Sequence, residues 1–204
     1  GVAAGNVWAG ILVDDLSVGT GWRTQRRVVS ENIYCFKKGI PMINAQMFRE
    51  TVIRPVLKAS GTYSEAAEEL MLGTMAHESD MGTYSIQQGI DEDRAAQGFF
   101  QVEKFTEADI WDTYLNRKPK FSAYAYELIK MCPGAVNLLR ENPLYNCFIA
   151  RMKYWRSPSA LPAVGDIKGQ AEYWFKYYNG SPENEREQKV AEYIRDYNQF
   201  VKGK

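Results

Sequence analysis

The chain has a single histidine, His77, which is followed directly by Glu78 in the stretch Met75-Ala-His-Glu-Ser-Asp-Met-Gly82. Such a pair could bind a metal, act as a catalytic dyad, or have no chemical role. The zinc-binding pattern HExxH needs a second histidine four residues after the first, but position 81 is a methionine. We therefore expect no metal and no cofactor. A histidine-activated nucleophile is also not expected, unless His77 itself is the base.

Glu78 is expected in the last turn of a helix, on the side that faces the core. Thr62 and Glu65 have the spacing of a capping box, which predicts a helix from about residue 64 to residue 79. On this helix, the threonine, methionine and alanine that lie four, seven and eleven residues before Glu78 fall within roughly 40° of it. His77 points about 100° away. Burial and the partially negative helix end should both raise the pKa of Glu78, as a general acid requires. The alternative is a partly exposed glutamate in a salt bridge.

The rest of the chain after residue 42 also has a helical pattern. Helix-start signals recur at Asn44, Thr106, Asn142 and Asp166. Residues 1–41 differ, because short β-branched runs alternate with glycines and predict loops with at most short strands. We expect a loop-rich N-terminal extension over residues 1–41 and a mainly α, multi-helix globular domain over residues 42–204.

Composition excludes several classes of protein. The 204 residues are 45% hydrophobic and include 25 basic and 25 acidic residues, which is typical of a soluble domain and argues against nucleic-acid binding through bulk charge. No run is apolar enough to span a membrane, and no signal peptide is evident. Three widely spaced cysteines, Cys35, Cys132 and Cys147, predict thiols in a protein folded under reducing conditions.

Four motifs follow one another along the chain. They are Glu78-Ser79 at a helix end, Ala96-Gln-Gly-Phe-Phe-Gln101, the helix Asn146-Cys-Phe-Ile-Ala-Arg-Met-Lys-Tyr154, and Tyr177-Tyr-Asn-Gly180. Over about residues 62–200 this order resembles the soluble lytic transglycosylases and other lysozyme-like muramidases. The resemblance implies a lysozyme-like α+β fold. Two phenylalanines replace the usual Leu-Met pair, and such departures look like those of phage-encoded members.

The resemblance also implies roles for single residues. Glu78 would be the general acid and then the base. Substrate contacts would come from Ser79, Gly98, Phe100, Gln101, Tyr178 and Asn179. Gly98 would let the backbone approach the sugar, Ser79 would contact the sugar or seat Glu78, and the Tyr178 hydroxyl would lie near the Glu78 carboxyl group. The alternatives are that Phe100 and Tyr178 belong to the core and that Asn179 only ends a helix.

The activity implied is cleavage of the MurNAc–GlcNAc β-1,4 bond of peptidoglycan with a single glutamate. A lysozyme that uses two carboxylates remains open, with Asp91 or Asp93 as the second, and the other candidates are Asp80, Glu92 and Glu103. Two further alternatives are a catalytically vestigial structural or binding protein on the same fold and a helical bundle that binds a protein partner.

The expected partners are peptidoglycan glycan strands and, through residues 1–41, other virion proteins, with no nucleic acid and no membrane span. The resemblance places the protein in a phage particle, or in the host cytoplasm after synthesis, acting on the cell wall.

Overall fold

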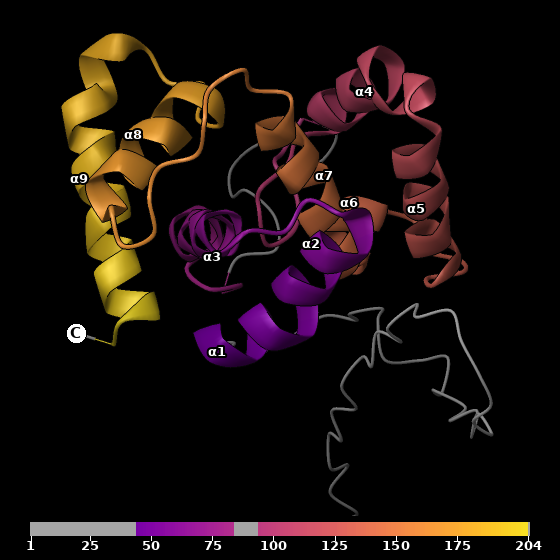
Figure 1. Ribbon diagram of the computed structural model, residues 1–204, viewed down its shortest axis with the longest axis horizontal. Helices are drawn as coiled ribbons and strands as arrows, with labels where there is room; N and C mark the ends of the chain where they lie inside the picture. The colour runs from indigo at the N-terminus through magenta and orange to yellow at the C-terminus, as the bar shows by residue number, and fades with distance from the viewer. Residues whose placement is uncertain (1–43, 84–93, 204) are drawn as a thin grey trace, which may run out of the picture.

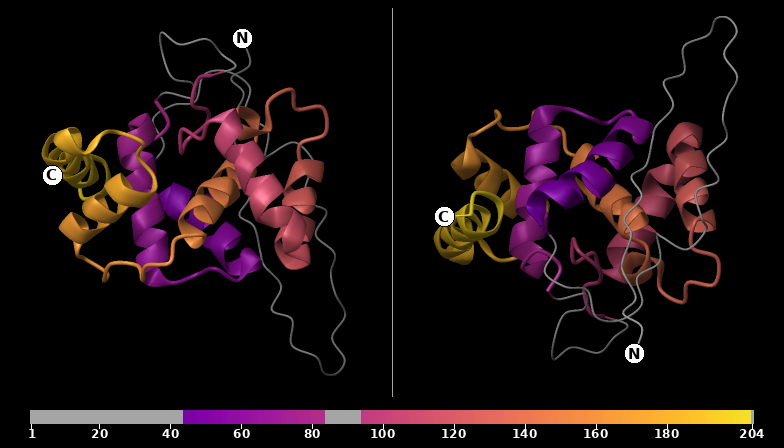
Figure 2. Two further views of the ribbon diagram at one scale, coloured as in Figure 1. Left: turned by 90° about the horizontal axis from the view of Figure 1, so that it is seen from above. Right: turned by 90° about the horizontal axis from the view of Figure 1, so that it is seen from below.

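The computed structural model describes residues 44–83 and 94–203, and these are mainly helical (Figures 1 and 2). Within this part of the chain the β-structure is limited to one isolated antiparallel bridge between Gln97 and Val102. The prediction of a mainly α domain is confirmed. The lysozyme-like class remains a prediction, and the extension over residues 1–41 lies outside the described residues.

The helices follow one another with short connections. In chain order they are α1 (Ala45–Phe48), a π-helical turn (Arg49–Ile53), α2 (Arg54–Ser60), α3 (Glu65–Ser79), α4 (Lys104–Thr113), a 3-10 turn (Leu115–Arg117), α5 (Pro119–Lys130), α6 (Leu138–Glu141), α7 (Pro143–Trp155), α8 (Ile167–Tyr177), a 3-10 turn (Glu183–Glu185), α9 (Arg186–Asp196) and a final π-helical turn (Tyr197–Val201).

Side-chain caps set five of these helix starts, those of α1, α3, α6, α7 and α8. Asn142 accepts from the Tyr145 N–H and precedes a proline at the first position of α7, as predicted. Asn44 and Asp166 also cap as predicted. Two predictions were wrong by a few residues. Ser64, rather than Thr62, caps α3, because the Thr62 hydroxyl is paired with Ser60, and α4 begins before Thr106, at Lys104.

Helix α3 lies at the centre of the fold. Figure 1 looks along its axis, with α8 and α9 on one side and α2 and α7 on the other. Most of its residues are buried, among them Leu70, Met71, Leu72 and Met75. Such a helix is surrounded by other helices and therefore needs apolar residues on nearly all of its faces. The buried helix α7 crosses it, and the Tyr154 hydroxyl lies 2.8 Å from Thr74 Oγ1.

The cysteines differ from the expectation of three thiols. Cys132 is disulfide-bonded, which contradicts it, whereas Cys147 is a buried free thiol. Cys35 lies outside the described residues. Across residues 44–83 and 94–203, no helix combines the length and the apolar composition needed to cross a lipid bilayer.

Candidate functional site

Glu78 lies in the last turn of α3, just before Asp80, which ends the helix in the left-handed conformation with φ 47°. Its carboxylate Oε1 accepts a hydrogen bond of 2.8 Å from Trp174 Nε1 of α8. Glu78 is partly exposed but closely surrounded by protein, and this burial raises the pKa of its carboxyl group. The pKa therefore moves in the direction that the helix position predicts.

No ion pair involves Glu78 in the described part of the chain, although a salt bridge was the plain alternative for a glutamate at a helix end. Trp174, its hydrogen-bond donor, is neutral and fully buried. The charges of His77 and Lys153 act against the rise in pKa, and the charge of Glu103 adds to it. The carboxyl group thus stands among charges of both signs without being neutralised by a contact cation.

Lys153 of α7 is a site residue that the sequence did not single out. Its Nζ donates a hydrogen bond of 2.7 Å to the Tyr178 carbonyl oxygen and lies 4.2 Å from the centroid of the Tyr178 ring. Burial lowers the pKa of this ammonium group, while Glu78 and Glu103 act to raise it. The available signal was a lysine within a helix whose other residues are mostly buried.

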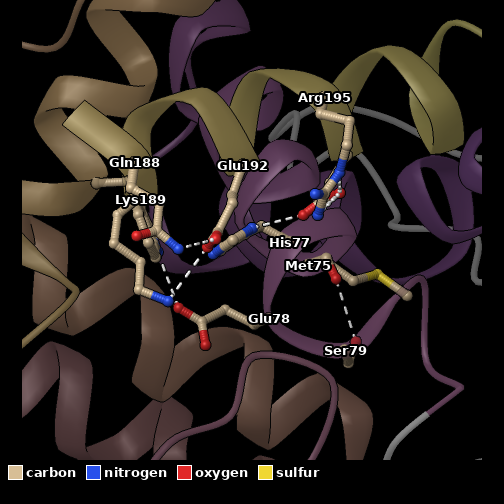
Figure 3. Close-up of polar contacts among 10 residues, drawn as sticks. Met75, His77, Glu78, Ser79, Gln188, Lys189, Glu192 and Arg195 are labelled. Carbon is tan, nitrogen blue, oxygen red and sulfur yellow. Dashed lines mark hydrogen bonds and ion pairs between the residues drawn. The ribbon is translucent and has the colours of Figure 1, made fainter. Parts of the chain in front are cut away.

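His77 belongs to a different face of α3. Its Nδ1 lies 2.7 Å from Asp196 Oδ2, and its ring meets the edge of Trp174 with centroids 4.4 Å apart. Figure 3 shows His77 beneath α9, the helix that carries Glu192 and Arg195, while Glu78 leaves α3 in another direction. His77 therefore joins α3 to α9 and does not form a dyad with Glu78.

Among the possible second carboxylates, Glu103 is the one whose charge acts on Glu78. It lies directly before α4 and is partly exposed. Asp80 interacts instead with Asp196, His77 and Arg195. The candidates at positions 91–93, Asp91, Glu92 and Asp93, lie outside the described residues.

Ser79 is fully buried and fastens the end of α3 to the loop that follows. Its hydroxyl lies 2.8 Å from the Phe99 carbonyl oxygen, to which it donates, and accepts from the Gly82 N–H at 3.0 Å. A direct contact of Ser79 with a sugar is therefore ruled out in this conformation. Its contribution is to hold the segment beside Glu78.

Gly98 permits a close backbone approach, but to the protein itself. Its φ is +74°, and a Cβ there would lie 2.1 Å from the Leu139 carbonyl oxygen. The buried Asn146 side chain bridges the same loop, accepting from the Phe100 N–H at 2.9 Å and donating to the Gln97 carbonyl oxygen at 3.1 Å. The expected approach of Gly98 to a sugar is corrected to an approach to α6 and α7.

The two residues expected to line subsites differ in exposure. Phe100 is fully buried, with its ring centroid 6.2 Å from that of Phe48, so the core alternative is correct. Gln101 is partly exposed, has a positive φ of 44°, and donates from Nε2 to the Gly98 carbonyl oxygen at 2.7 Å. Gln101 can still reach a ligand, whereas Phe100 cannot.

Tyr178 and Asn179 close α8 near the same loop. The Tyr178 hydroxyl donates to the Phe100 carbonyl oxygen at 2.6 Å rather than to Glu78, and Tyr178 is 4% exposed. Burial, followed by the charge of Glu78, raises its pKa. Asn179 Oδ1 accepts from the Ser181 N–H at 2.6 Å, so its side chain holds the turn. Both residues therefore stabilise the structure around the site through these hydrogen bonds.

The arrangement is chemically suited to proton transfer by one carboxyl group. Within the described residues, no three His, Cys, Asp or Glu side chains gather as a metal site would require. Comparison with family models, with curated proteins and with solved structures finds no match to this chain.

Proposed function

We propose that this protein cleaves the glycan strands of peptidoglycan as a lytic transglycosylase, with Glu78 as general acid and then base. The observation that carries the proposal is the Glu78 carboxyl group itself. It is desolvated, has a raised pKa, and is bound by the neutral Trp174 N–H instead of a contact cation. The four motifs that resemble the lysozyme-like muramidases supply the substrate class.

In the proposed reaction, protonated Glu78 gives its proton to the glycosidic oxygen as the bond to the sugar C1 breaks. The 6-hydroxyl oxygen of the same sugar then attacks C1, and Glu78 takes the hydroxyl proton back. No water is consumed, and the product is a 1,6-anhydro sugar. Burial favours the protonated acid, whereas the Trp174 N–H and the Lys153 charge favour the carboxylate formed between the two steps.

The test compares wild-type protein with Glu78→Gln on purified peptidoglycan, with products analysed by mass spectrometry. We expect anhydromuropeptides from the wild type and a loss of at least about 100-fold in the variant, the lower end of the contribution of a general acid. Glu65→Gln is the matched control, because Glu65 is an exposed glutamate in the first turn of the same helix. Full activity in Glu78→Gln would refute the assignment of Glu78 as the catalytic residue. If the wild type released no muropeptides at any pH from 4 to 8, the proposed enzymatic activity would be refuted.

Glu103 supports a hydrolytic variant of the same proposal. A second carboxylate that positions water would yield reducing sugar ends instead of anhydro sugars. In that case Glu103→Gln should abolish release as fully as Glu78→Gln does. If Glu103→Gln keeps anhydro products at near wild-type rate, the single-carboxylate mechanism holds.

A non-catalytic binding protein on the same fold is the second candidate. The observation that favours it is the burial of Ser79, Phe100 and Tyr178, three of the residues that the resemblance assigned to substrate contacts. Such a protein would sediment with insoluble peptidoglycan and release nothing. A phage particle as the setting remains a proposal that rests on the divergence of the motifs.

A further inference from the structure

A cavity of about 330 Å³ lies away from Glu78, at the opposite end of α3. Its walls come from the connection between α2 and α3, the last turns of α7, the loop that follows α7, and α8. Residues 64 and 78 lie about 20 Å apart along a helix, at 1.5 Å per residue. The lining includes Thr62, Tyr63, Arg151, Trp155, Ser159 and Tyr173. The cavity therefore does not belong to the proposed catalytic site.

Arg151 is the single charged residue in this lining. It is 3% exposed, yet no carboxylate pairs with it in the part of the chain that the structure describes. Its one hydrogen bond there runs from Nη2 to the Thr62 carbonyl oxygen, at 3.3 Å, and its enclosed Nε has no acceptor. Burial lowers its pKa to about 10, so the guanidinium group is still charged at neutral pH.

A buried cation without a counter-ion is unfavourable, because it loses hydration and gains no opposite charge. The surroundings add positive charge rather than removing it. Lys58 Nζ lies 5.3 Å from the centroid of the Tyr63 ring, and the Lys120 ammonium group lies beside Gly61, which also lines the cavity. The cavity is therefore a site where an anion would be stabilised.

The walls favour a ligand with a ring-shaped body. The Trp155 ring lies 5.0 Å from Arg151 Cζ, and Trp155 and Tyr63, which are 40% and 37% exposed, both line the cavity and offer it aromatic surface. Polar groups stand at the rim, where the Tyr173 hydroxyl donates to the Ser159 carbonyl oxygen at 3.1 Å. Stacking surfaces with a few polar groups and one cation suit a sugar acid. A single guanidinium group with unused N–H donors can bind a carboxylate through two parallel hydrogen bonds, and its one charge matches the single charge of a carboxylate.

We propose that this cavity is a second binding site, separate from the catalytic one, for a carboxylate-bearing sugar. Arg151 holds the carboxylate, and Trp155 and Tyr63 contact the sugar ring. Under the proposed function, which this inference extends, such a site would hold the glycan through its acidic sugar at a distance from the bond being cleaved.

The experiment titrates the full chain with N-acetylmuramic acid and follows the indole N–H signals of its tryptophans by ¹H–¹⁵N NMR. N-acetylglucosamine is the neutral matched ligand, because it lacks the carboxylate. Trp155 reports on the cavity and Trp174 reports on Glu78. The two signals are assigned with Trp155→Phe and Trp174→Phe. We expect the Trp155 signal to shift with an affinity at least 10-fold higher for the acid than for the neutral sugar.

Three variants test the role of Arg151 and the separation of this cavity from the proposed catalytic site. Arg151→Met should abolish the shift. Because Arg151 is buried and its loss can impair folding, Ser159→Glu supplies a second test by placing a competing carboxylate at the rim without touching the core. It should weaken binding at least 10-fold. Glu78→Gln should leave the affinity at Trp155 unchanged, which separates this site from the proposed catalytic one.

Four results would overturn the inference. The first is equal affinity for the neutral sugar and the acid at Trp155. The second is an affinity that Ser159→Glu does not change. The third is tighter binding of the dipeptide L-alanyl-D-glutamate than of the sugar acid, which would make the ligand an acidic peptide. Shifts confined to Trp174 would also reject the cavity, while leaving the proposed function intact.

Discussion

Replacing Asn146 with alanine should destabilise the protein by releasing the loop beside Glu78. The Asn146 side chain is fully buried and uses both ends of its amide, accepting from the Phe100 N–H and donating to the Gln97 carbonyl oxygen. The Phe100 carbonyl oxygen also accepts a hydrogen bond from the Tyr178 hydroxyl group. The loop is therefore bound to both α7 and α8.

The magnitude follows from the two backbone groups that the substitution leaves without partners. Each buried group left unsatisfied costs about 1–3 kcal/mol, so Asn146→Ala should lower the free energy of unfolding by about 2–6 kcal/mol. A domain of this kind has a total stability of about 5–15 kcal/mol, so the effect is a large part of it. Asn146→Asp keeps the acceptor for Phe100 but faces the Gln97 carbonyl oxygen with a carboxylate, which cannot donate.

Urea unfolding followed by circular dichroism gives the free energies of unfolding of the wild type and of Asn146→Ala. Asn116→Ala is the control, because Asn116 is exposed, and it should change stability by no more than about 0.5 kcal/mol. Asn146→Asp should recover part of its stability in acid, where its protonated carboxyl group can donate to Gln97. A loss below about 1 kcal/mol in Asn146→Ala, with an unchanged urea slope, would refute the bridging role.

Three further predictions concern neighbouring residues. Gly98→Ala should cost at least about 2 kcal/mol in urea unfolding, because a side chain at φ +74° is strained and its Cβ would meet the Leu139 carbonyl oxygen; an unchanged midpoint would show that the loop can shift. Glu78→Gln should be more stable than wild type at neutral pH. The raised pKa of Glu78 gives the wild type full stability below the ordinary glutamate pKa of about 4.3, and this stability is lost as the pH rises through the raised value. The difference in Tm should therefore widen from pH 4 to pH 8, and a constant difference would contradict it. Tyr178→Phe should lower the free energy of unfolding by about 1–3 kcal/mol, because the Phe100 carbonyl oxygen loses its donor; a thermal scan equal to that of wild type would contradict this.

The local features of the site could be predicted from the sequence. The helix expected over residues 64–79 is found at Glu65–Ser79, because its apolar positions are encoded within a few residues of one another, although Ser64 caps it in place of Thr62. The separation of His77 from Glu78 also follows from helix geometry alone, and Asp196 confirms it by holding His77 on the α9 side.

The long-range contacts could not be predicted in the same way. Asn146 meets residues that lie more than forty positions earlier, and nothing in the spacing marks it as the bridge. A phenylalanine suits both a ligand-binding groove and the core, so the sequence alone did not decide where Phe100 lies. Tertiary packing buries it in the core. Lys153 was missed because a lysine in a helix is usually solvated, and only the fold places it near Glu78 and Glu103.

Near each end of α3 lies a charge that a purely structural role does not explain, Glu78 of α3 at one end and Arg151 of α7 at the other. The other charged side chains that are buried in the described part of the chain are paired, Glu68 with Arg54 at 2.7 Å and Asp196 with His77 at 2.7 Å. Glu78 and Arg151 have no such partner within the described residues. Leaving a charge unpaired and largely desolvated reduces stability, and proteins tolerate this mainly where a ligand or a reaction uses the charge. The proposed action on an acidic glycan would use both charges, the acid at one end to give and take a proton and the cation near the other end to hold a carboxylate.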